Sequence, residues 1–409
     1  GHVGGNLTDD ATDIAIDAAG NAYVAGTTSS EAGFPATGRP SQAPAGQSDA
    51  YVVKVRADGT GFVYGRIVGG TGDENGLGVA VDGEGAAHLV GVTAPGTQFP
   101  ATVGPDLTFG GGSNDGFVAR VKPDGSGLDY CGFVGGTGQE AATRVAVDAT
   151  GAAYVVGSTN SDQGSGFPLA VGPDLTYNDG ASVAGSDAFV AKVLPDGTGF
   201  AYCGYIGGAN GDASTAVAVD ASGAAYVAGT TLSSEASFPV SGGPDSTFNG
   251  GTATGDVFVA MVRPDGTGLA FATYLGGSGD EAPGAVGLDG AGNVYVAGLT
   301  GTTDGSFPAV RSLARAGGSD GFVVKLSAGP PGPSISSVAK VGKKLVVTGA
   351  NFAAGAQIQV DGTRFKTKRD PAAPTTSLNS KKAGKAVMPG DVVTVRNPDG
   401  AVSNGVTFQ

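Results

Sequence analysis

The chain has 409 residues, of which 40% are hydrophobic and 15% charged, so it is long and apolar enough for two or three folded domains. Its formal net charge of −14 argues against a nucleic-acid partner, since phosphates require a basic surface. Two cysteines argue against a disulfide-stapled scaffold, and no apolar run approaches the roughly 18 residues that a membrane-spanning helix needs.

A repeated unit fills the chain up to about Ala328. Gly-Gly pairs end at Gly5, Gly70, Gly136, Gly208 and Gly277, with periods of 65, 66, 72 and 69 residues. A Thr that closes a strand follows each pair by 23 residues, and an Asp that opens a strand precedes the next pair by 21 residues. All variation in length therefore falls between that Thr and that Asp, which indicates a tolerant surface loop.

Each unit predicts two hairpins. In the first unit, apolar segments of Thr12 to Thr28 flank Asp-Ala-Ala-Gly-Asn, and segments of Asp49 to Gly70 flank Ala-Asp-Gly-Thr-Gly. The Gly at the fourth place of the first turn suits a type I turn followed by a left-handed residue. Five tandem units of four antiparallel strands predict an all-β fold, a five-bladed β-propeller over residues 1–328.

The phase of the repeat predicts how the ring closes. The fifth unit ends after its third strand, Asp320 to Leu326, whereas the chain begins with Gly-His-Val-Gly-Gly, the end of a fourth strand. We expect Gly1 to Gly5 to pair beside Asp320 to Leu326 and remove an open sheet edge. This beginning inside a strand also predicts that residues precede Gly1 in a precursor.

The repeated motifs resemble a known family. Asp-x-x-Gly-Asn/Ala-x-Tyr-Val-x-Gly-x-Thr, Phe-Pro and Asp-Ala/Gly-Phe-Val-x-Lys recur in the order typical of the bacterial SBBP β-propeller repeat. The family's name implies seven blades, whereas five units are present here. The resemblance implies a secreted or cell-surface protein, often beside adhesive modules, and it implies no established chemistry.

A second domain follows a Pro/Gly hinge at 329–333. Residues 334–409 predict a small β-sandwich. Their Pro-x-Ile start, Thr348 to Phe352 and Val395 to Gly400 resemble the IPT/TIG immunoglobulin-like module. The resemblance implies a spacer or adhesive unit in bacterial surface proteins, although related modules of transcription factors contact DNA.

Charge divides unevenly between the two predicted domains. From Pro333 onward the chain carries 11 Lys and Arg against 4 Asp, a net +7, which leaves −21 for the remainder. The sequence therefore predicts self-association between the acidic propeller and the basic domain, head to tail and with a filament as one outcome. Docking of the basic domain on an anionic surface polymer, or mere differences in solvation, are the alternatives.

Catalytic candidates are scarce. His88 occupies the place held by Tyr23, Tyr154, Tyr226 and Tyr295 in the other units, and the only other histidine is His2, so Ser-His and Cys-His schemes lack a base. Most acids recur at turns or strand starts, where a structural hydrogen bond explains the repetition. We therefore expect no enzyme activity; a propeller lyase or glycosidase acting on surface polysaccharide through carboxylates is the alternative.

Two sets of residues are candidates for binding. Acids that follow the Gly-Gly pairs could hold Ca²⁺, which takes 6 to 8 oxygen ligands, although no EF-hand spacing is present. These acids are Asp9, Asp10, Asp73, Glu74, Asp280 and Glu281. No other cofactor is expected. Phenylalanines of the variable loops could contact a protein or glycan at the cell surface, or could only cap the blades: Phe34, Phe99, Phe167, Phe238 and Phe307.

Cys131 and Cys203 occupy the same place in neighbouring units, where Gly65 and Ala272 stand elsewhere. A disulfide requires Cα atoms within about 7 Å, and blade geometry places these positions on the order of 20 Å apart. We expect two free, buried thiols.

Overall fold

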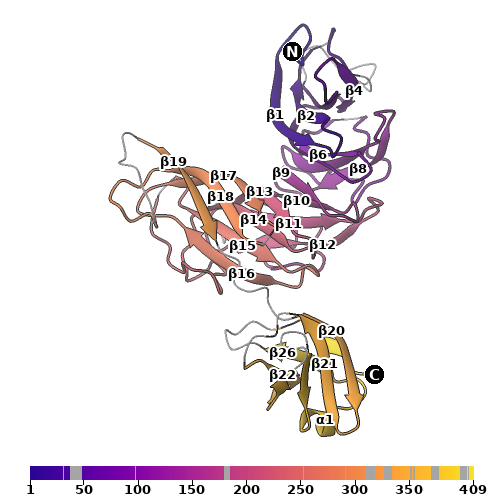
Figure 1. The fold of residues 1–409 in the computed structure, drawn as a ribbon. Helices are drawn as coiled ribbons and strands as arrows, with labels where there is room; N and C mark the ends of the chain where they lie inside the picture. Colours follow the sequence, from indigo (N-terminus) through magenta and orange to yellow (C-terminus); the bar gives the residue numbers. More distant parts are fainter. Residues whose placement is uncertain are drawn as a thin grey trace. The chain divides into compact units, whose positions relative to one another are not determined.

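The computed structural model describes residues 1–30, 32–36, 48–96, 98–178, 185–251, 253–290, 292–308, 318–326, 334–350, 352, 355–369, 377–396, 403 and 405–409. They form 27 strands and one short helix (Figure 1). The chain divides into two compact units, the first made of Gly1–Gly290 and Val294–Leu326, the second of Ser327–Gln409 and 291–293. The predicted hinge at 329–333 lies outside the described residues.

The first unit consists of five antiparallel sheets, numbered 1 to 5 in chain order (Figure 1). Sheets 1 and 2 contain β1 (Asp9–Ile16), β2 (Ala22–Thr28), β3 (Asp49–Val55), β4 (Phe62–Val68), β5 (Glu74–Val81), β6 (Ala87–Thr93), β7 (Asp115–Val121) and β8 (Leu128–Val134). Sheets 3 and 4 contain β9 (Glu140–Val147), β10 (Ala153–Thr159), β11 (Asp187–Val193), β12 (Phe200–Ile206), β13 (Asp212–Val219), β14 (Ala225–Thr231), β15 (Asp256–Val262) and β16 (Leu269–Leu275). Sheet 5 has three strands, β17 (Glu281–Leu288), β18 (Val294–Thr300) and β19 (Asp320–Leu326).

The predicted hairpin chemistry is confirmed. At the first turn, Asp17 Oδ1 accepts hydrogen bonds from the backbone N–H groups of Ala19 and Asn21, and Gly20 has φ = 84°. The equivalent glycines of the other sheets, Gly85, Gly151, Gly223 and Gly292, have φ between 78° and 84°. A side chain at such a φ is strained, so the repeated glycine is a requirement of the turn.

Consecutive sheets meet along their first strands. The Oγ1 atom of Thr12 donates to the Gly76 carbonyl at 2.7 Å, and that of Thr143 donates to the Ser214 carbonyl at 2.7 Å. Each of these strands has a register shift at the same place, between Ala11 and Asp13 in β1, so the displaced threonine faces the next sheet. The strand after each Gly-Gly pair is therefore the one that joins the sheets.

The apolar core lies between consecutive sheets. Sheets 1 and 2, for example, bury Val52 together with Leu89 and Cys131. Cys131 and Cys203 are free and buried, as predicted. Burial raises the pKa of both thiols well above the usual range.

The variable segments run along the fourth strands. The backbone N–H of Cys131 donates to Val103, that of Cys203 donates to Val171, and Ser241 forms a bridge with Ala272. These contacts cover the outer edges of β8, β12 and β16, which would otherwise present unpaired backbone groups. The segments therefore extend the sheets, a role that the sequence did not indicate.

The predicted closing strand is not formed among the described residues. Gly1–Gly5 has no strand structure, and β19 pairs only with β18. Instead, Val3 packs against Tyr51 and Ile67 of sheet 1, and Gly5 N–H donates to Asp9 Oδ2 at 2.7 Å. Extensive contact between sheets joins only consecutive ones among the described strands. The first unit is thus an all-β, propeller-like array.

The second unit contains two four-stranded sheets around one apolar core that includes Leu345, Ile358 and Val393. The strands are β20 (Ser334–Val341), β21 (Lys344–Ala350), β22 (Gln357–Val360), β23 (Thr363–Phe365), β24 (Lys368–Arg369), β25 (Ser377–Ser380), β26 (Val392–Arg396) and β27 (Val406–Thr407). The helix is α1 (Ala383–Ala386). In the part of the chain that the structure describes, no helix has the length and apolarity to cross a membrane.

Candidate functional site

Carboxyl groups are buried in pairs where consecutive sheets meet. One member opens the third strand of a sheet, and the other opens the first strand of the next sheet. A Cβ on Gly207 would stand 2.6 Å from Asp187 Oδ1 and 3.0 Å from Asp212 Oδ2, so only a glycine leaves room for both carboxyls. The four pairs are Asp49 and Glu74, Asp115 and Glu140, Asp187 and Asp212, and Asp256 and Glu281.

The second member of each pair anchors the Gly-Gly pair before it. Glu74 Oε2 accepts from Gly70 N–H at 2.7 Å, and its Oε1 accepts from Thr93 Oγ1 at 2.8 Å. Glu140 repeats both contacts with Gly136 and Thr159. The invariant spacings of Gly-Gly and Thr in the sequence therefore belong to one hydrogen-bonded junction.

Burial changes the proton affinity of three of these acids. It raises the pKa of Glu74 to about 7, and the neighbouring charge of Asp49 adds to the effect. Burial likewise raises the pKa of Asp115 and of Asp256 to about 7, with a smaller contribution from Glu140 and from Glu281. Such carboxylic acids resemble a glycosidase general acid in proton affinity, but all of these side chains are at most 2% exposed.

The calcium candidates do not converge on one point. Glu74 and Glu281 turn into the buried junctions, whereas exposed Asp73 accepts from Ser48 N–H, and Asp280 Oδ1 accepts from three backbone N–H groups of 253–255. Asp9 accepts from Gly5, Thr28 and Ser30, and the Asp10 side chain is exposed. Over the described residues, no group of three or more His, Cys, Asp or Glu could hold a metal ion. Calcium binding stays a prediction.

The five phenylalanines of the variable segments pack into their sheets. Phe167 stacks on Tyr205 with ring centroids 5.4 Å apart, and Phe238 lies 5.2 Å from Phe258. Phe34, Phe99 and Phe307 make the corresponding contacts with Tyr51, Phe117 and Phe322. The rings tie each variable segment to its sheet, which supports the capping alternative for them.

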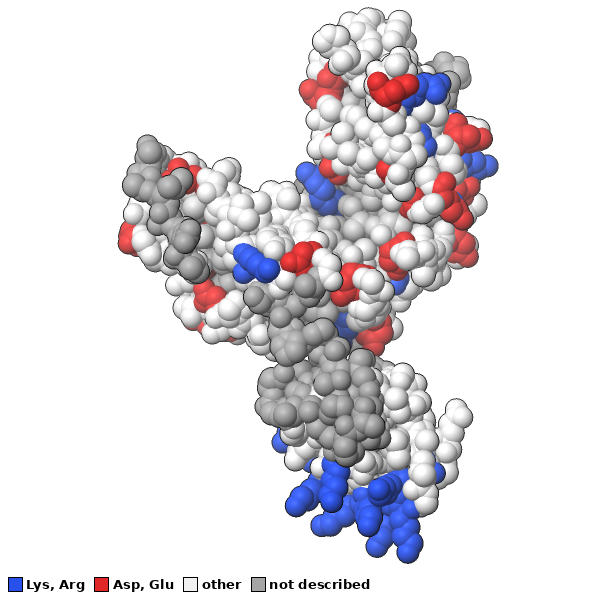
Figure 2. Space-filling view, in the orientation of Figure 1, with Lys and Arg blue, Asp and Glu red and all other residues white. Residues whose placement is uncertain are grey.

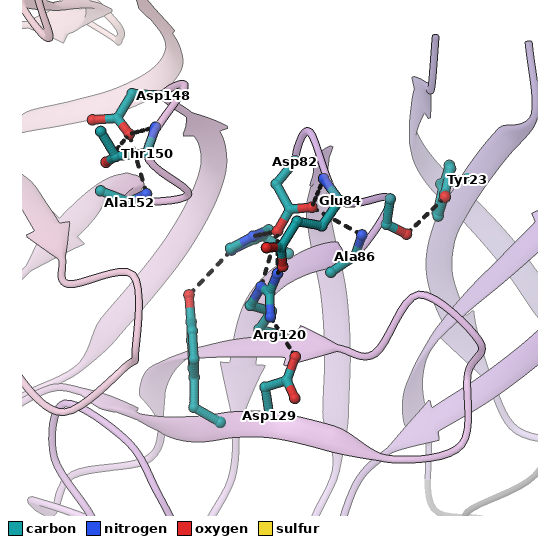
Figure 3. Close-up of polar contacts among 12 residues, drawn as sticks. Tyr23, Asp82, Glu84, Ala86, Arg120, Asp129, Asp148, Thr150 and Ala152 are labelled. Carbon is teal, nitrogen blue, oxygen red and sulfur yellow. Dashed lines mark hydrogen bonds and ion pairs between the residues drawn. The ribbon is translucent and has the colours of Figure 1, made fainter. Parts of the chain in front are cut away.

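Sheet 2 contains a buried cluster of charged residues around Asp82 and Arg120 (Figure 3). Asp82 Oδ2 accepts from His88 Nε2 at 3.1 Å and from Arg120 Nε at 2.9 Å and Nη2 at 2.7 Å. Arg120 also contacts Glu84 at 2.6 Å and Asp129. The other ring nitrogen of His88 lies 3.1 Å from the Tyr130 hydroxyl.

The electrostatics of this cluster fix its protonation. Burial lowers the pKa of His88, and the opposing effect of Asp82 does not restore it. Burial alone would raise the pKa of Asp82, but the hydrogen bonds from His88 and Arg120 hold it well below the usual range. At neutral pH a neutral His88 donates from Nε2 to a carboxylate that is already paired. Since His88 is 0% exposed, no substrate can reach it in this arrangement.

The same positions hold a simpler cluster elsewhere. In sheet 1, the ammonium of Lys54 lies 4.7 Å from the ring centroid of Tyr23 and 3.4 Å from Asp17. Sheet 3 repeats the arrangement with Lys192, Tyr154 and Asp148, and sheet 5 repeats it with Lys325, Tyr295 and Asp289. The interpretation of His88 as a substituted structural aromatic is consistent with this repetition. A sequence signal for this cluster exists: a Lys or Arg recurs near the end of the third strand in every sheet except sheet 4, which has Met261 there.

A hollow of about 590 Å³ opens beside sheet 1. Its walls are Phe34–Ala36, Val63–Gly65 and the turn 124–126 of sheet 2. Among the described residues, the hydroxyl of Tyr64 is buried there without a hydrogen-bond partner, and Asp124 is the only acid that lines the hollow. Asp124 is exposed and accepts from Ser126 N–H, so the described lining of the hollow offers no pair of carboxyls for hydrolysis.

Six exposed lysines gather at one end of the second unit (Figure 2). They are Lys340, Lys343, Lys344, Lys381, Lys382 and Lys385. Gly384 lets α1 lie against the start of β21, since a Cβ there would stand 2.6 Å from the Lys344 carbonyl carbon. This packing brings two separate lysine groups together, and we call them the lysine patch. The sequence indicated the excess of charge but not this clustering.

Comparisons with known proteins agree with the repeat. Residues 3–35 match the SBBP beta-propeller repeat. A search of curated proteins gives no match. The matched residues include the first hairpin and the Phe34-Pro35 pair, and the same motifs recur in the later units.

Several solved structures are similar in outline. A protein of unknown function from Dyadobacter fermentans is similar over 92% of this chain and 96% of its own, with 9% identity and a TM-score of 0.43. A gluconolactonase of Xanthomonas campestris is similar over 81% of both chains, with 13% identity and a TM-score of 0.31. An acylaminoacyl peptidase is similar over 84% of this chain and 49% of its own, with 7% identity and a TM-score of 0.30. Likenesses this distant carry no argument about activity.

Proposed function

We propose that this chain is a non-catalytic structural or adhesive protein, secreted or held at the bacterial cell surface. The single observation that carries the proposal is the repetition of its buried titratable groups. The carboxyl pairs occupy the same positions at four junctions, and the one histidine cluster is sealed and already paired. A residue needed once for catalysis has no reason to recur at each junction, whereas a structural hydrogen bond does.

The second unit supplies the contact in this proposal, as an IPT/TIG immunoglobulin-like module. Its lysine patch suits an anionic partner, either a surface polymer or the acidic first unit of another copy. The first unit carries the excess of negative charge, with acids distributed over its surface (Figure 2). Exposed ion pairs contribute little individually and are screened beyond about 8 Å at physiological salt, so the contact is expected to weaken as salt rises.

A binding experiment tests this contact. The full chain is passed over surfaces coated with dextran sulfate or with neutral dextran, and retention is measured against salt concentration. We expect retention on dextran sulfate only, and its loss in Lys381→Gln/Lys382→Gln/Lys385→Gln. The control Arg56→Gln/Lys122→Gln/Arg263→Gln removes the same charge from exposed positions on three sheets of the first unit and should bind almost as the unaltered chain does. Equal binding by the two triple variants would overturn the role of the patch.

A turnover experiment tests the absence of catalysis. The protein is incubated with anionic and neutral polysaccharides, and new reducing ends and unsaturated uronates are measured. The expected result is no product above a heated sample. Turnover that disappears in Glu74→Gln while the fold is retained would instead favour the carboxylate lyase or glycosidase.

A further inference from the structure

One position of the third strand is buried in four sheets and exposed in the fifth. Val52, Val118, Val190 and Val259 are each 0% exposed, whereas Val323 is 74% exposed. In sheets 1 to 4 this valine belongs to the face that packs on the next sheet, as Val52 does in the core shared with sheet 2. Sheet 5 therefore presents a sheet-packing face that the described residues leave uncovered.

Sheet 1 presents the complementary face. Ile14 and Ile16 in β1 are 59% and 65% exposed, whereas Val79 and Val145, the residues equivalent to Ile14 in β5 and β9, are 5% and 7% exposed. Val79 is buried because it packs on the preceding sheet, in the same core as Val52. Sheet 1 thus carries the apolar side chains that this contact requires, and they face solvent.

Gly59 of sheet 1 and Gly321 of sheet 5 also lie on faces that no described sheet covers. A Cβ on Gly197 in sheet 3 would overlap the ring of Tyr130 from sheet 2, whereas a Cβ on Gly59, its equivalent in sheet 1, would meet no atom within 4 Å. A Cβ on Gly116 in sheet 2 would stand 3.2 Å from the Cβ of Ala142 in sheet 3, whereas one on Gly321, its equivalent in sheet 5, would meet only a carbonyl oxygen at 3.8 Å.

We propose that sheet 5 of one copy packs on sheet 1 of a second copy, through the contacts that join consecutive sheets within the chain. The occupant is inferred from four interfaces already present, because each pairs the same two faces. Extensive contact within one chain joins only consecutive sheets among the described strands, so both end faces are available to another copy. The two faces differ, so the assembly is head to tail and either closes into a ring or extends.

This inference rests on the proposed structural role and adds an apolar joint to it. Charge attraction between the lysine patch and the first unit weakens with salt, whereas burial of apolar side chains does not. High salt should therefore weaken the lysine-patch contact and leave the apolar joint between sheets 5 and 1 intact.

Disulfide trapping tests the joint directly. Ala11 is the residue of β1 equivalent to Ala142, and a Cβ on Gly116 would stand 3.2 Å from the Cβ of Ala142. Ala11→Cys and Gly321→Cys should therefore place two Cβ atoms about as close as the roughly 3.5–4.5 Å that a disulfide needs. The full-length double variant is oxidised, and its mass is read on a non-reducing denaturing gel. We expect a ladder of covalent multimers that reductant removes. Cys131 and Cys203 are buried and should not contribute.

The single variants Ala11→Cys and Gly321→Cys are the matched controls, and both should run as monomers on the denaturing gel, since each carries only one of the two introduced cysteines. No linkage in the double variant would overturn the proposal. A disulfide within one chain, seen as a monomer of shifted mobility at every concentration, would also overturn it and would show that the chain closes on itself. Linkage in a single variant would indicate a like-with-like contact and contradict the head-to-tail joint.

Solution mass provides a readout that needs no cysteine. Sedimentation of the full chain should show association that increases with protein concentration and persists at high salt. Val323→Asp places a charge in the joint and should weaken association by about 100-fold or more. The control Val171→Asp changes an exposed valine of a variable segment, 50% exposed, and should have little effect. Association that high salt abolishes and Val323→Asp leaves intact would overturn the joint while leaving the lysine-patch contact standing.

Discussion

The carboxyl groups of Asp187 and Asp212 come from consecutive sheets and flank the backbone of Gly207, whose missing side chain leaves the space that both occupy. The same arrangement at the other junctions places pairs of acids inside a protein whose sequence carries 37 acids and only 23 Lys and Arg. Packing of the sheets and protonation of the chain are therefore coupled.

The first prediction concerns pH. Glu74, Asp115 and Asp256 have pKa values of about 7 in the folded chain and ordinary values near 4 when unfolded, so the folded state binds more protons between these limits. The free energy of unfolding should therefore fall by roughly 2 kcal/mol or more from about pH 5 to about pH 8. Denaturant titrations at the two pH values measure it.

Asp256→Asn is the variant for this prediction, because it removes one titrating group and should flatten the pH dependence.

In strong acid the trend reverses. Hydrogen bonds outweigh burial and lower the pKa of Asp17 and Asp148 to about 2, so the stability that these two carboxylates contribute to the fold is lost as the pH falls from about 4 to about 2. Greater stability at pH 8 than at pH 5 would contradict the first prediction.

The second prediction concerns Gly135. A Cβ there would stand 2.6 Å from Asp115 Cγ and within 2.9 Å of both its carboxylate oxygens. Gly135→Ala should lower the free energy of unfolding by about 2–4 kcal/mol, whereas Gly127→Ala, where a Cβ meets nothing within 4 Å, should change it by less than about 1 kcal/mol. Adding Asp115→Ala to Gly135→Ala should recover part of the loss. Equal losses at Gly135 and Gly127 would rule out the crowded junction.

The third prediction concerns the cluster of sheet 2. Arg120→Ala leaves the buried Asp82 carboxylate without its ion pair and should cost about 3–5 kcal/mol of stability. The double variant His88→Tyr/Arg120→Lys rebuilds the Asp, Tyr and Lys arrangement of sheets 1 and 3. It should lose much less stability than the sum of the losses in His88→Tyr and in Arg120→Lys. A double-mutant cycle from thermal or denaturant unfolding measures the difference. Strict additivity would show that the cluster does not act as a unit.

The fourth prediction concerns the thiols. Cys131 and Cys203 are buried, and burial raises the pKa of both, so neither should react with a thiol reagent in the folded chain. Unfolding in denaturant should release both thiols together, because they lie in cores that the sheets form jointly. Spectrophotometric titration of free thiol before and after denaturation checks this. Reaction of one thiol in native buffer would show that a sheet junction opens.

Sequence alone determined the hairpins, because turn and strand preferences are local. Gly20 and its equivalents stand at turn positions that need a positive φ, and the apolar segments on either side have the composition of strands. The regular spacing of these turns and segments therefore predicted the order of the hairpins along the chain. The repeat also identified His88 as a replaced tyrosine and Cys131 and Cys203 as equivalent buried positions. Local pattern could not predict that Gly1–Gly5 would lie against sheet 1, since that choice depends on where Val3 can be buried.

Only the tertiary structure decided which residues from distant parts of the chain come together. Asp187 and Asp212 are acids of separate strands in the sequence, and their approach follows from the stacking of whole sheets around Gly207. The lysine patch forms because α1 packs on β21, and Val323 is exposed where Val52 is buried because no described sheet packs on it. Sequence determined each sheet because its hydrogen bonds are local, whereas burial and charge proximity depend on what packs against its faces.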